Sequence, residues 1–148
     1  ARQLILRAAR RLRDVSRNPD LDNLPADAAL EVLVREHCAL VLEHPSEMGL
    51  LIQQRRFVEP RALGEITERE RLYVANLRSV IARGVQEGRF RELDAGVTTQ
   101  LILDTINGLL RWYRPGGRLA REQAVEEIWR FVRGGLCRHA APRARPKR

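Results

Sequence analysis

The side chains that could ligate a metal ion or act as nucleophiles are few and poorly placed for joint chemistry. His37 and His44 are seven residues apart in one predicted helix. They share a face but lie about 10 Å apart along the axis at ~1.5 Å per residue, too far to bind one metal ion. Cys38 points elsewhere on the helix, so His37 is not placed to activate its thiol. Because the sequence also has no glycine-rich phosphate loop, Cys-x-x-Cys pair or nucleophile elbow, we expect no enzyme, metal site or cofactor.

A second set of polar residues is better suited to binding. Asn76, Thr99 and Asn107 interrupt apolar helix faces near Tyr73. Apolar walls with a few polar groups are typical of a small-molecule pocket. The alternative is a closed core in which the two asparagines bond each other or backbone carbonyls. The pocket prediction names twelve lining residues: His37, Val41, Met48, Leu51, Ile52, Tyr73, Asn76, Leu77, Thr99, Leu103, Asn107 and Trp112.

The elements that must position these residues are all predicted to be helices. Apolar residues recur at intervals of three and four, and no stretch alternates as a strand would. A first helix ends at Asn18-Pro19, and a long one lies between Pro60 and Gly88. Asp27 and Asp94 are predicted N-caps. The remaining helices are expected at about 27–43, 46–56, 94–113 and 121–136.

Length and composition indicate one soluble domain. The chain has 148 residues, 44% of them hydrophobic and 31% charged, enough for one compact core. No apolar run approaches the 18 or so residues of a membrane-spanning helix, and the start lacks the pattern of a secretory signal. Cys38 and Cys137 are too few for a disulfide framework. We therefore expect a cytoplasmic protein with reduced cysteines and no membrane partner.

The net charge of +8 is concentrated at the two ends. Residues 1–17 and the tail from Arg138 each carry +5, so the middle of the chain is slightly acidic. A surface that reads DNA needs its basic residues on a folded element of groove size. We predict a folded domain over 1–138, followed by a basic disordered tail over 139–148.

The last two predicted helices are more apolar than one core requires. Their apolar residues cover most of the circumference, which is typical of helices buried on all sides. A second copy of the chain could supply the missing partner surface through a two-fold interface of four helices. The alternative is a single large core with these helices at its centre. The predicted interface residues are Leu101, Leu109, Val125, Ile128, Trp129 and Val132.

Three stretches carry a family resemblance. They are Asn107-Gly-Leu-Leu-Arg-Trp-Tyr-Arg-Pro-Gly-Gly117, Gln86-Glu-Gly-Arg-Phe-Arg91 with the following Leu93-Asp94, and His44-Pro45 before a short apolar helix. Together with the helix order over residues 1–138, they resemble a branch of the TetR family of bacterial regulators. The resemblance implies that the six helices are that family's fourth to ninth and that the last two form a homodimer's four-helix bundle. It also implies an effector pocket for acyl-CoA thioesters or related lipophilic molecules.

The family's three N-terminal helices, which contain the helix-turn-helix, are absent from this sequence. Since the chain does not begin with Met, we expect that a DNA-binding region has been lost from it. The expected function is the effector-binding half of a repressor that releases operator DNA when its ligand binds. The arginines of the first helix could link the pocket to that region, meet the phosphates of a CoA ligand, or form a solvated face. The alternative function is a small helical dimeric binding or adaptor protein with no DNA role.

Overall fold

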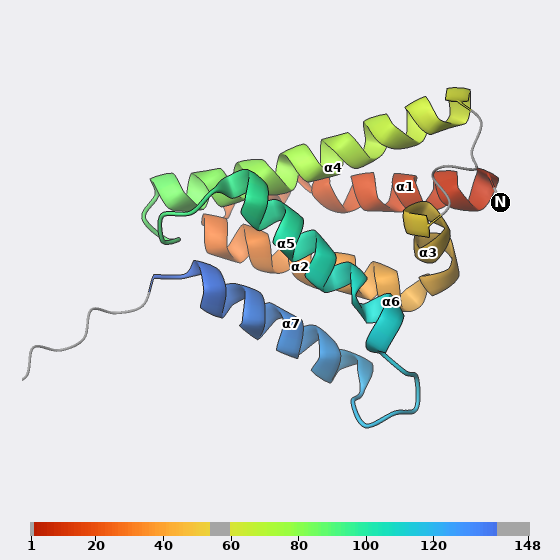
Figure 1. Ribbon diagram of the computed structural model, residues 1–148. Coiled ribbons are helices and arrows are strands. Elements are labelled where there is room, and N and C mark those ends of the chain that lie inside the picture. Colours follow the sequence, from red (N-terminus) through yellow and green to blue (C-terminus); the bar gives the residue numbers. More distant parts are fainter. Residues whose placement is uncertain (1, 54–59, 139–148) are drawn as a thin grey trace, which may run out of the picture.

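The computed structural model describes residues 2–53 and 60–138, apart from the side chains of 60–63, 65 and 66. Within these ranges all regular elements are helices, which confirms the all-α prediction (Figure 1). The predicted tail over 139–148 lies outside the described residues. The elements are α1 (Arg2–Ser16), η1 (Pro19–Asn23), α2 (Ala26–Glu43), α3 (Pro45–Gln53), α4 (Pro60–Gln86), α5 (Ala95–Asn107), α6 (Leu109–Trp112) and α7 (Arg121–Leu136).

Helix α2 is the centre of the fold. It contacts every other helical element, with α1 and α4 on one side of it and α7 on the other (Figure 1). Its fully buried residues cover one half of the helix, and most residues on the other half are partly buried. The sequence analysis expected this environment for the last two helices. In the structure, both α5 and α7 keep an apolar flank exposed to solvent.

Helix α1 is amphipathic and covers α3 and α4. Ile5, Ala8, Ala9 and Leu12 recur at intervals of one, three and four and are buried against these neighbours. The small Ala8 and Ala9 side chains are fully buried, which lets the backbone of α1 approach its neighbouring helices closely. Most arginines of α1 lie on the opposite, exposed face. The helix ends at Ser16, close to the predicted stop before Asn18-Pro19.

The start of α2 corrects the predicted N-cap. The helix begins at Ala26, so Asp27 lies inside its first turn, and Pro25 at the N-cap position has no side-chain hydrogen bond to offer. Instead the Ala26 N–H donates to the Glu87 carboxylate over 3.3 Å. This acceptor comes from the distant end of α4, and an anion at a helix N-terminus is favoured by the unpaired N–H groups there.

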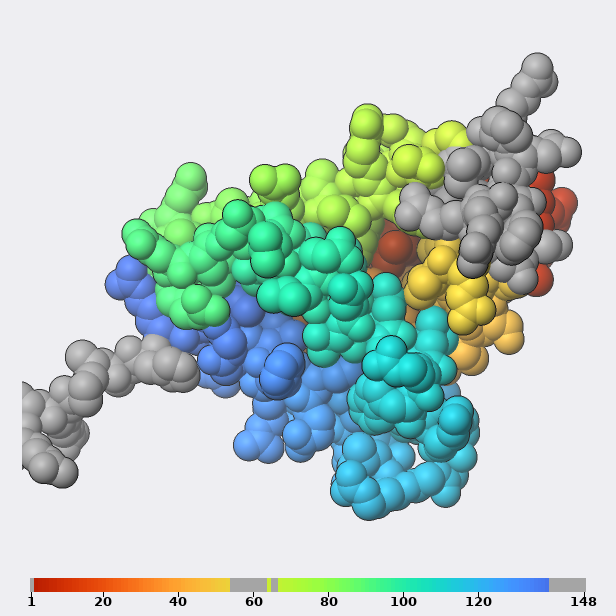
Figure 2. Space-filling model, viewed as in Figure 1, coloured from red at the N-terminus to blue at the C-terminus, as the bar shows by residue number. Residues whose placement is uncertain are grey.

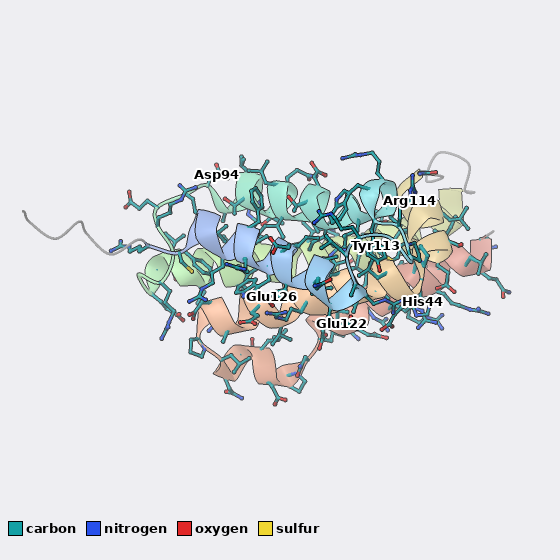
Figure 3. All side chains as sticks on the ribbon, turned by 90° about the horizontal axis from the view of Figure 1, so that it is seen from below. His44, Asp94, Tyr113, Arg114, Glu122 and Glu126 are labelled. Atoms are coloured by element: carbon teal, nitrogen blue, oxygen red, sulfur yellow. The ribbon has the colours of Figure 1, made fainter. Side chains whose placement is uncertain are left out.

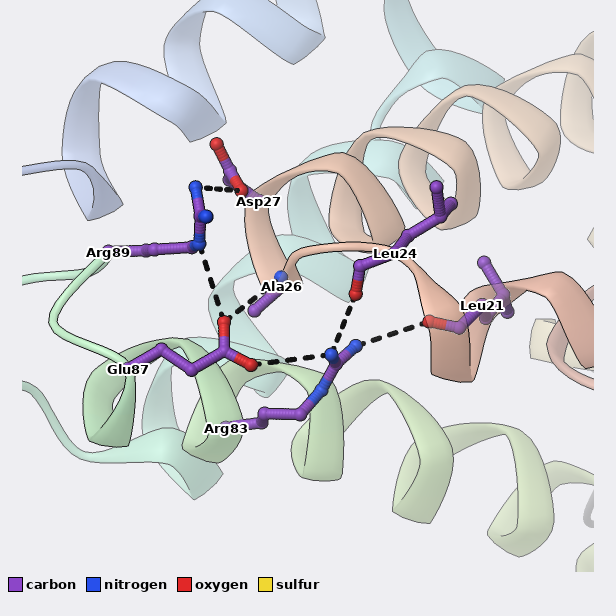
Figure 4. A network of polar contacts seen from close by, with 7 residues as sticks. All are labelled: Leu21, Leu24, Ala26, Asp27, Arg83, Glu87 and Arg89. Atoms are coloured by element: carbon purple, nitrogen blue, oxygen red, sulfur yellow. Dashed lines mark hydrogen bonds and ion pairs between the residues drawn. The ribbon is translucent and has the colours of Figure 1, made fainter.

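Two arginines, one near the end of α4 and one just after it, stabilise this junction (Figure 4). Arg83 donates to the backbone oxygens of Leu21 and Leu24, over 3.2 and 2.7 Å. Arg89 pairs with Asp27 over 3.2 Å. The chain between α1 and α2 contains η1, and Arg83 bonds one carbonyl within η1 and one directly after it. These contacts fix where α2 starts relative to α4.

Helix α4 ends where the sequence predicts. Gly88 has φ of +72°, a conformation that strongly favours glycine. The chain then folds back, and the N–H groups of Arg89 and Phe90 both donate to the Gly84 oxygen over 3.0 Å. A Cβ on Gly84 would lie 2.1 Å from the buried Phe90 ring. Gly84 is thus the position that lets Phe90 close this end of the core.

The predicted helix over 94–113 is two helices. Its N-cap is confirmed, because the Asp94 carboxylate accepts from the Val97 N–H over 2.9 Å. However, α5 ends at Asn107, and the chain turns at Gly108 into the single turn of α6 (Figure 1). Glycine has a poor helix propensity, by about 1 kcal/mol relative to alanine, which favours a break at this residue.

Figure 3 shows the two ends of this segment far apart, with Asp94 at the start of α5 and Tyr113 after α6. Tyr113 and Arg114 lie at the same end of the molecule as His44. Helix α7 returns below α5 and is tied to α2 by the 2.6 Å bond from Arg35 to Glu126. The third helix begins at Pro45, one residue before its predicted start, and its predicted end over 54–56 lies outside the described residues.

Candidate ligand-binding site

Helices α1 to α5 surround a partly open cavity of about 290 Å³ that is lined by both apolar and polar side chains. Helix α3 forms one wall, because its start at Pro45 turns Met48 and Leu51 inward, where both are buried. The facing walls come from α2, α4 and α5. The lining consists of Leu12, His37, Met48, Leu51, Ile52, Glu70, Tyr73, Val74, Gln100, Leu103, Asp104 and Asn107.

A buried His–Tyr pair forms the polar part of the cavity wall. The Tyr73 hydroxyl lies 2.8 Å from His37 Nδ1, and the two rings meet edge to face with centroids 5.1 Å apart. Burial lowers the pKa of His37 from 6.5 to about 4 and raises the pKa of Tyr73 far above its ordinary range. Both side chains are therefore uncharged at neutral pH.

The hydrogen bond assigns the proton of His37. A neutral imidazole carries one proton, on either Nδ1 or Nε2. The Tyr73 hydroxyl has no other partner among the described residues, so its O–H is best used as a donor to Nδ1. The imidazole proton then sits on Nε2. That nitrogen is buried and has no hydrogen-bond partner within the described part of the chain.

Asn107 provides the second unpaired atom of the lining. Its Oδ1 is buried and accepts no hydrogen bond from the described residues. Unpaired buried polar atoms are rare in native proteins because each costs about 1–3 kcal/mol. His37 Nε2 and Asn107 Oδ1 come from helices 70 positions apart in the sequence and line the same cavity. Two residues of the lining therefore carry a buried polar atom that makes no hydrogen bond with the described residues.

The charged groups of the lining are acidic. Glu70 and Asp104 contribute carboxylates, and no Lys or Arg is among the described residues of the lining. Asp104 accepts one hydrogen bond from Gln100 over 3.0 Å.

Seven of the predicted lining residues meet at this cavity. They come from four helices, and the structure brings them together as the pocket prediction requires. They are His37, Met48, Leu51, Ile52, Tyr73, Leu103 and Asn107.

The other five predicted residues lie elsewhere. Asn76 donates to the Ser16 hydroxyl over 3.0 Å, which holds the end of α1 on α4. Thr99 donates to the carbonyl one turn earlier in α5 over 2.7 Å. Val41 and Leu77 are buried in the core outside the cavity lining. Trp112 is 45% exposed and lines a separate shallow hollow with Tyr113 and Arg114, because the break at Gly108 turns it away from α5.

Sequence reasoning missed Leu12, Glu70, Val74, Gln100 and Asp104. The signal was present on α5, where Gln100 and Asp104 are spaced by three from Leu103 and Asn107 and share their stripe. Gln100 and Asp104 were missed because their polar side chains were expected to face solvent.

A separate apolar groove of about 460 Å³ runs between α5 and α7. Figure 2 shows the exposed flank of α5 next to α7 on this side of the molecule. Leu101 and Phe131 line the groove and are 61% and 73% exposed, and Val97 nearby is also exposed. Large exposed apolar side chains that cluster in this way mark interaction surfaces.

The groove changes which residues a partner could reach. Of the predicted interface residues, Leu101 is exposed and Val125 is partly buried. The others pack inside the single chain and can only support such a surface from below. They are Leu109, Ile128, Trp129 and Val132. Val97 and Phe131 were not predicted, because helical spacing places them beside residues that are buried.

Other types of site find little support. Among the described residues, no three His, Cys, Asp or Glu side chains are grouped closely enough to hold a metal ion. In that same part of the chain, no helix combines the length and apolar character that crossing a bilayer requires. Cys38 and Cys137 are free thiols.

Comparison with known proteins agrees with this architecture. Residues 23–136 match the model of the family described as "Tetracyclin repressor-like, C-terminal domain". The chain is 31% identical over 111 residues to the HTH-type transcriptional repressor KstR2 of Mycolicibacterium smegmatis, covering 74% of this chain and 50% of that protein. It is 29% identical over 113 residues to KstR2 of Mycobacterium tuberculosis, covering 75% and 52%. The chain thus spans about half the length of the curated relatives it matches.

Solved structures share the fold. The crystal structure of AibR in complex with isovaleryl coenzyme A and operator DNA superposes with a TM-score of 0.73 at 20% identity, over 88% of this chain and 73% of that one. The family model covers most of the chain, including α2, the groove and all of the cavity walls except α1. The TetR resemblance predicted from the sequence is therefore confirmed, and the chain belongs to the family of tetracyclin repressor-like C-terminal domains.

Proposed function

We propose that this chain is the effector-binding and dimerisation domain of a TetR-type transcriptional repressor, and that the cavity is its effector site. The observation that carries the proposal is a cavity with a mixed apolar and polar lining, in which two lining residues each have an unpaired polar atom. A domain with a purely structural role would fill this space and pair these atoms. The curated relatives are repressors, and we assign operator binding to a helix-turn-helix outside this sequence. Such a protein would work in the cytoplasm as a regulator rather than an enzyme.

We propose an acyl group, offered as a coenzyme A thioester, as the leading candidate ligand. At about 30 Å³ for each non-hydrogen atom, a cavity of about 290 Å³ holds roughly ten such atoms. That space suits a short acyl chain but not the nucleotide part of coenzyme A, which would stay outside. AibR, which has the same fold, binds isovaleryl coenzyme A. Exposed arginines of α1 are available for the phosphates.

Helix α1 is the element through which a ligand would act. Leu12 lines the cavity, while Arg11 on the same helix pairs with Glu47 of α3 over 3.3 Å. A ligand that presses on Leu12 would shift α1 against α3. In the intact dimer, this would change the spacing of two DNA-reading heads whose half-sites are about 34 Å apart. Operator affinity falls only if the ligand prefers the shifted form.

The groove between α5 and α7 is the proposed dimer interface. A second copy placed by a two-fold axis would cover Leu101 and Phe131 on both partners. The test is sedimentation velocity of the chain and of Leu101→Glu. We expect a dimer that the substitution converts to monomer, because an isologous interface buries the new charge twice. Leu72→Glu, on the exposed side of α4, is the matched control and should stay dimeric.

The effector proposal is tested by thermal unfolding of the chain with isovaleryl coenzyme A or with free coenzyme A. At a ligand concentration of about 100 Kd the stabilisation is about 2.7 kcal/mol, which raises Tm by roughly 5–10 °C in a domain of this size. We expect this rise with the thioester alone. Leu103→Trp should abolish it by filling the cavity. An equal rise with free coenzyme A would place binding outside the cavity and contradict the proposal.

The second candidate is a helical binding or adaptor protein without a DNA role. The two functions differ in one experiment. The protein as its gene encodes it is mixed with the DNA upstream of that gene, and the mobility of the DNA is measured. A regulator lowers the mobility of a discrete DNA fragment and releases this fragment when ligand is added. An adaptor leaves the mobility of the DNA unchanged.

A further inference from the structure

The polar atoms of the cavity specify more than its size. His37 Nε2 carries a proton because Tyr73 occupies Nδ1, and it finds no acceptor among the described residues. The His37 side chain is 1% exposed and its Nε2 is buried, so a ligand oxygen reaches this nitrogen from the cavity only after a lining side chain moves aside. A donor held this way by its neighbour is oriented before any ligand arrives, which reduces the entropy lost on binding.

We propose that the ligand carries an uncharged carbonyl or hydroxyl oxygen on an otherwise apolar body, and that this oxygen accepts a hydrogen bond from His37 Nε2–H. This inference rests on the proposed effector cavity and adds the chemical group that it selects. Asn107 is the second contact. A hydroxyl donates to Asn107 Oδ1, while a carbonyl uses the amide group after rotation of the Asn107 side chain.

The charges around the cavity reject the acid form of such a ligand. A carboxylate would face the Asp104 carboxylate, and no Lys or Arg is among the described residues that line the cavity. Burying a further anion there costs desolvation and repulsion. The site should therefore distinguish a ketone, ester or alcohol from the fatty acid of equal length.

Tyr73 is a positioning residue in this arrangement. Without its hydroxyl, the proton of His37 is free to move to Nδ1, and Nε2 then becomes an acceptor. Tyr73→Phe should weaken binding of a carbonyl ligand, although the phenylalanine ring leaves the cavity shape unchanged. A residue that merely packed would show no such selective effect.

The experiment measures the affinity of the chain for four probes of similar length by calorimetric titration. They are 2-nonanone, 2-nonanol, nonanoate and 2-methyl-1-nonene, in which a CH₂ group replaces the carbonyl oxygen of the ketone at nearly the same shape. We expect 2-nonanone and 2-nonanol to bind about two- to tenfold more tightly than the alkene, the range for one net hydrogen bond. Nonanoate should bind most weakly at pH 7.5.

Four variants assign this selectivity. His37→Leu should remove the preference for ketone over alkene, and Tyr73→Phe should reduce it. His37→Gln, which can place an amide N–H near the position of Nε2, should retain it. Asn107→Leu should weaken 2-nonanol more than 2-nonanone. The readout is the ratio of two affinities within each variant, so a change in stability does not imitate the result.

The outcomes separate this inference from the proposed function. If the alkene binds wild type as tightly as the ketone, or if His37→Leu keeps the ketone preference, the hydrogen-bond assignment is overturned and the effector cavity stands. If nonanoate binds best, the charge reasoning is wrong. If none of the four probes binds, both the inference and the cavity as an effector site are refuted.

Discussion

Acid should destabilise this domain through one residue. The pKa of His37 is about 4 in the folded chain and 6.5 in an ordinary exposed histidine, because burial disfavours the charged ring. Between pH 6.5 and 4 the unfolded chain binds a proton at His37 that the folded chain does not. The contribution of His37 to the free energy of unfolding is therefore fully present above pH 6.5 and is lost as the pH drops towards 4. A shift of this size corresponds to about 3 kcal/mol, at 1.36 kcal/mol for each pKa unit.

The assay is urea unfolding followed by circular dichroism at pH 7.5 and pH 4.5, for wild type and His37→Gln. Carboxylates titrate in both proteins, so the quantity of interest is the difference between their free energies of unfolding. On going from pH 7.5 to pH 4.5, wild type should lose about 2–3 kcal/mol more free energy of unfolding than His37→Gln. If the difference is the same at both pH values, His37 is not a buried neutral imidazole, and the donor assigned to its Nε2 is refuted.

Two further predictions concern packing and reactivity. Gly84→Ala should lower the free energy of unfolding by about 1–3 kcal/mol, because its Cβ would lie 2.1 Å from the Phe90 ring; Gly49→Ala, with open space around it, is the matched control in urea unfolding, and equal effects would contradict the contact. Burial raises the pKa of Cys38 to about 12, so a thiol reagent at pH 8 should modify the partly exposed Cys137 first, and faster labelling of Cys38 would show that α2 is not the closed centre of the fold.

Local signals in the sequence predicted the helices well. Apolar residues at intervals of three and four identified each long helix, and Asp94 and Gly88 cap their helices as expected. These features depend on neighbours within one turn. The N-cap of α2 failed as a prediction because its partner, Glu87, comes from 61 residues away. The break at Gly108 was not predicted because the surrounding apolar pattern continues unchanged through it.

The site was predicted in part for a similar reason. Periodicity identifies which face of a helix is buried, and that was enough to select Met48, Leu103 and Asn107. It does not tell which buried polar side chains find partners. Asn76 is paired with Ser16, whereas Asn107 Oδ1 has no partner among the described residues, and only the packing of α1 and α4 distinguishes the two.

The interface shows the same limit. The excess of apolar residues on the last two helices indicated a second surface, and an exposed groove does lie between α5 and α7. Which residues face outward depends on how α7 is rotated against α2. That rotation buries Trp129 and exposes Phe131.

Met48 offers the most direct test of the central claim that this cavity is the effector site. It is the only methionine of the chain, it is buried, and it lines the cavity. Labelling its methyl group with ¹³C therefore gives one NMR signal from the cavity wall. We predict that 2-nonanone shifts this signal saturably, with the same Kd as the heat of binding, and that Leu103→Trp abolishes both. Heat of binding with an unchanged Met48 signal would place the ligand elsewhere and contradict the account.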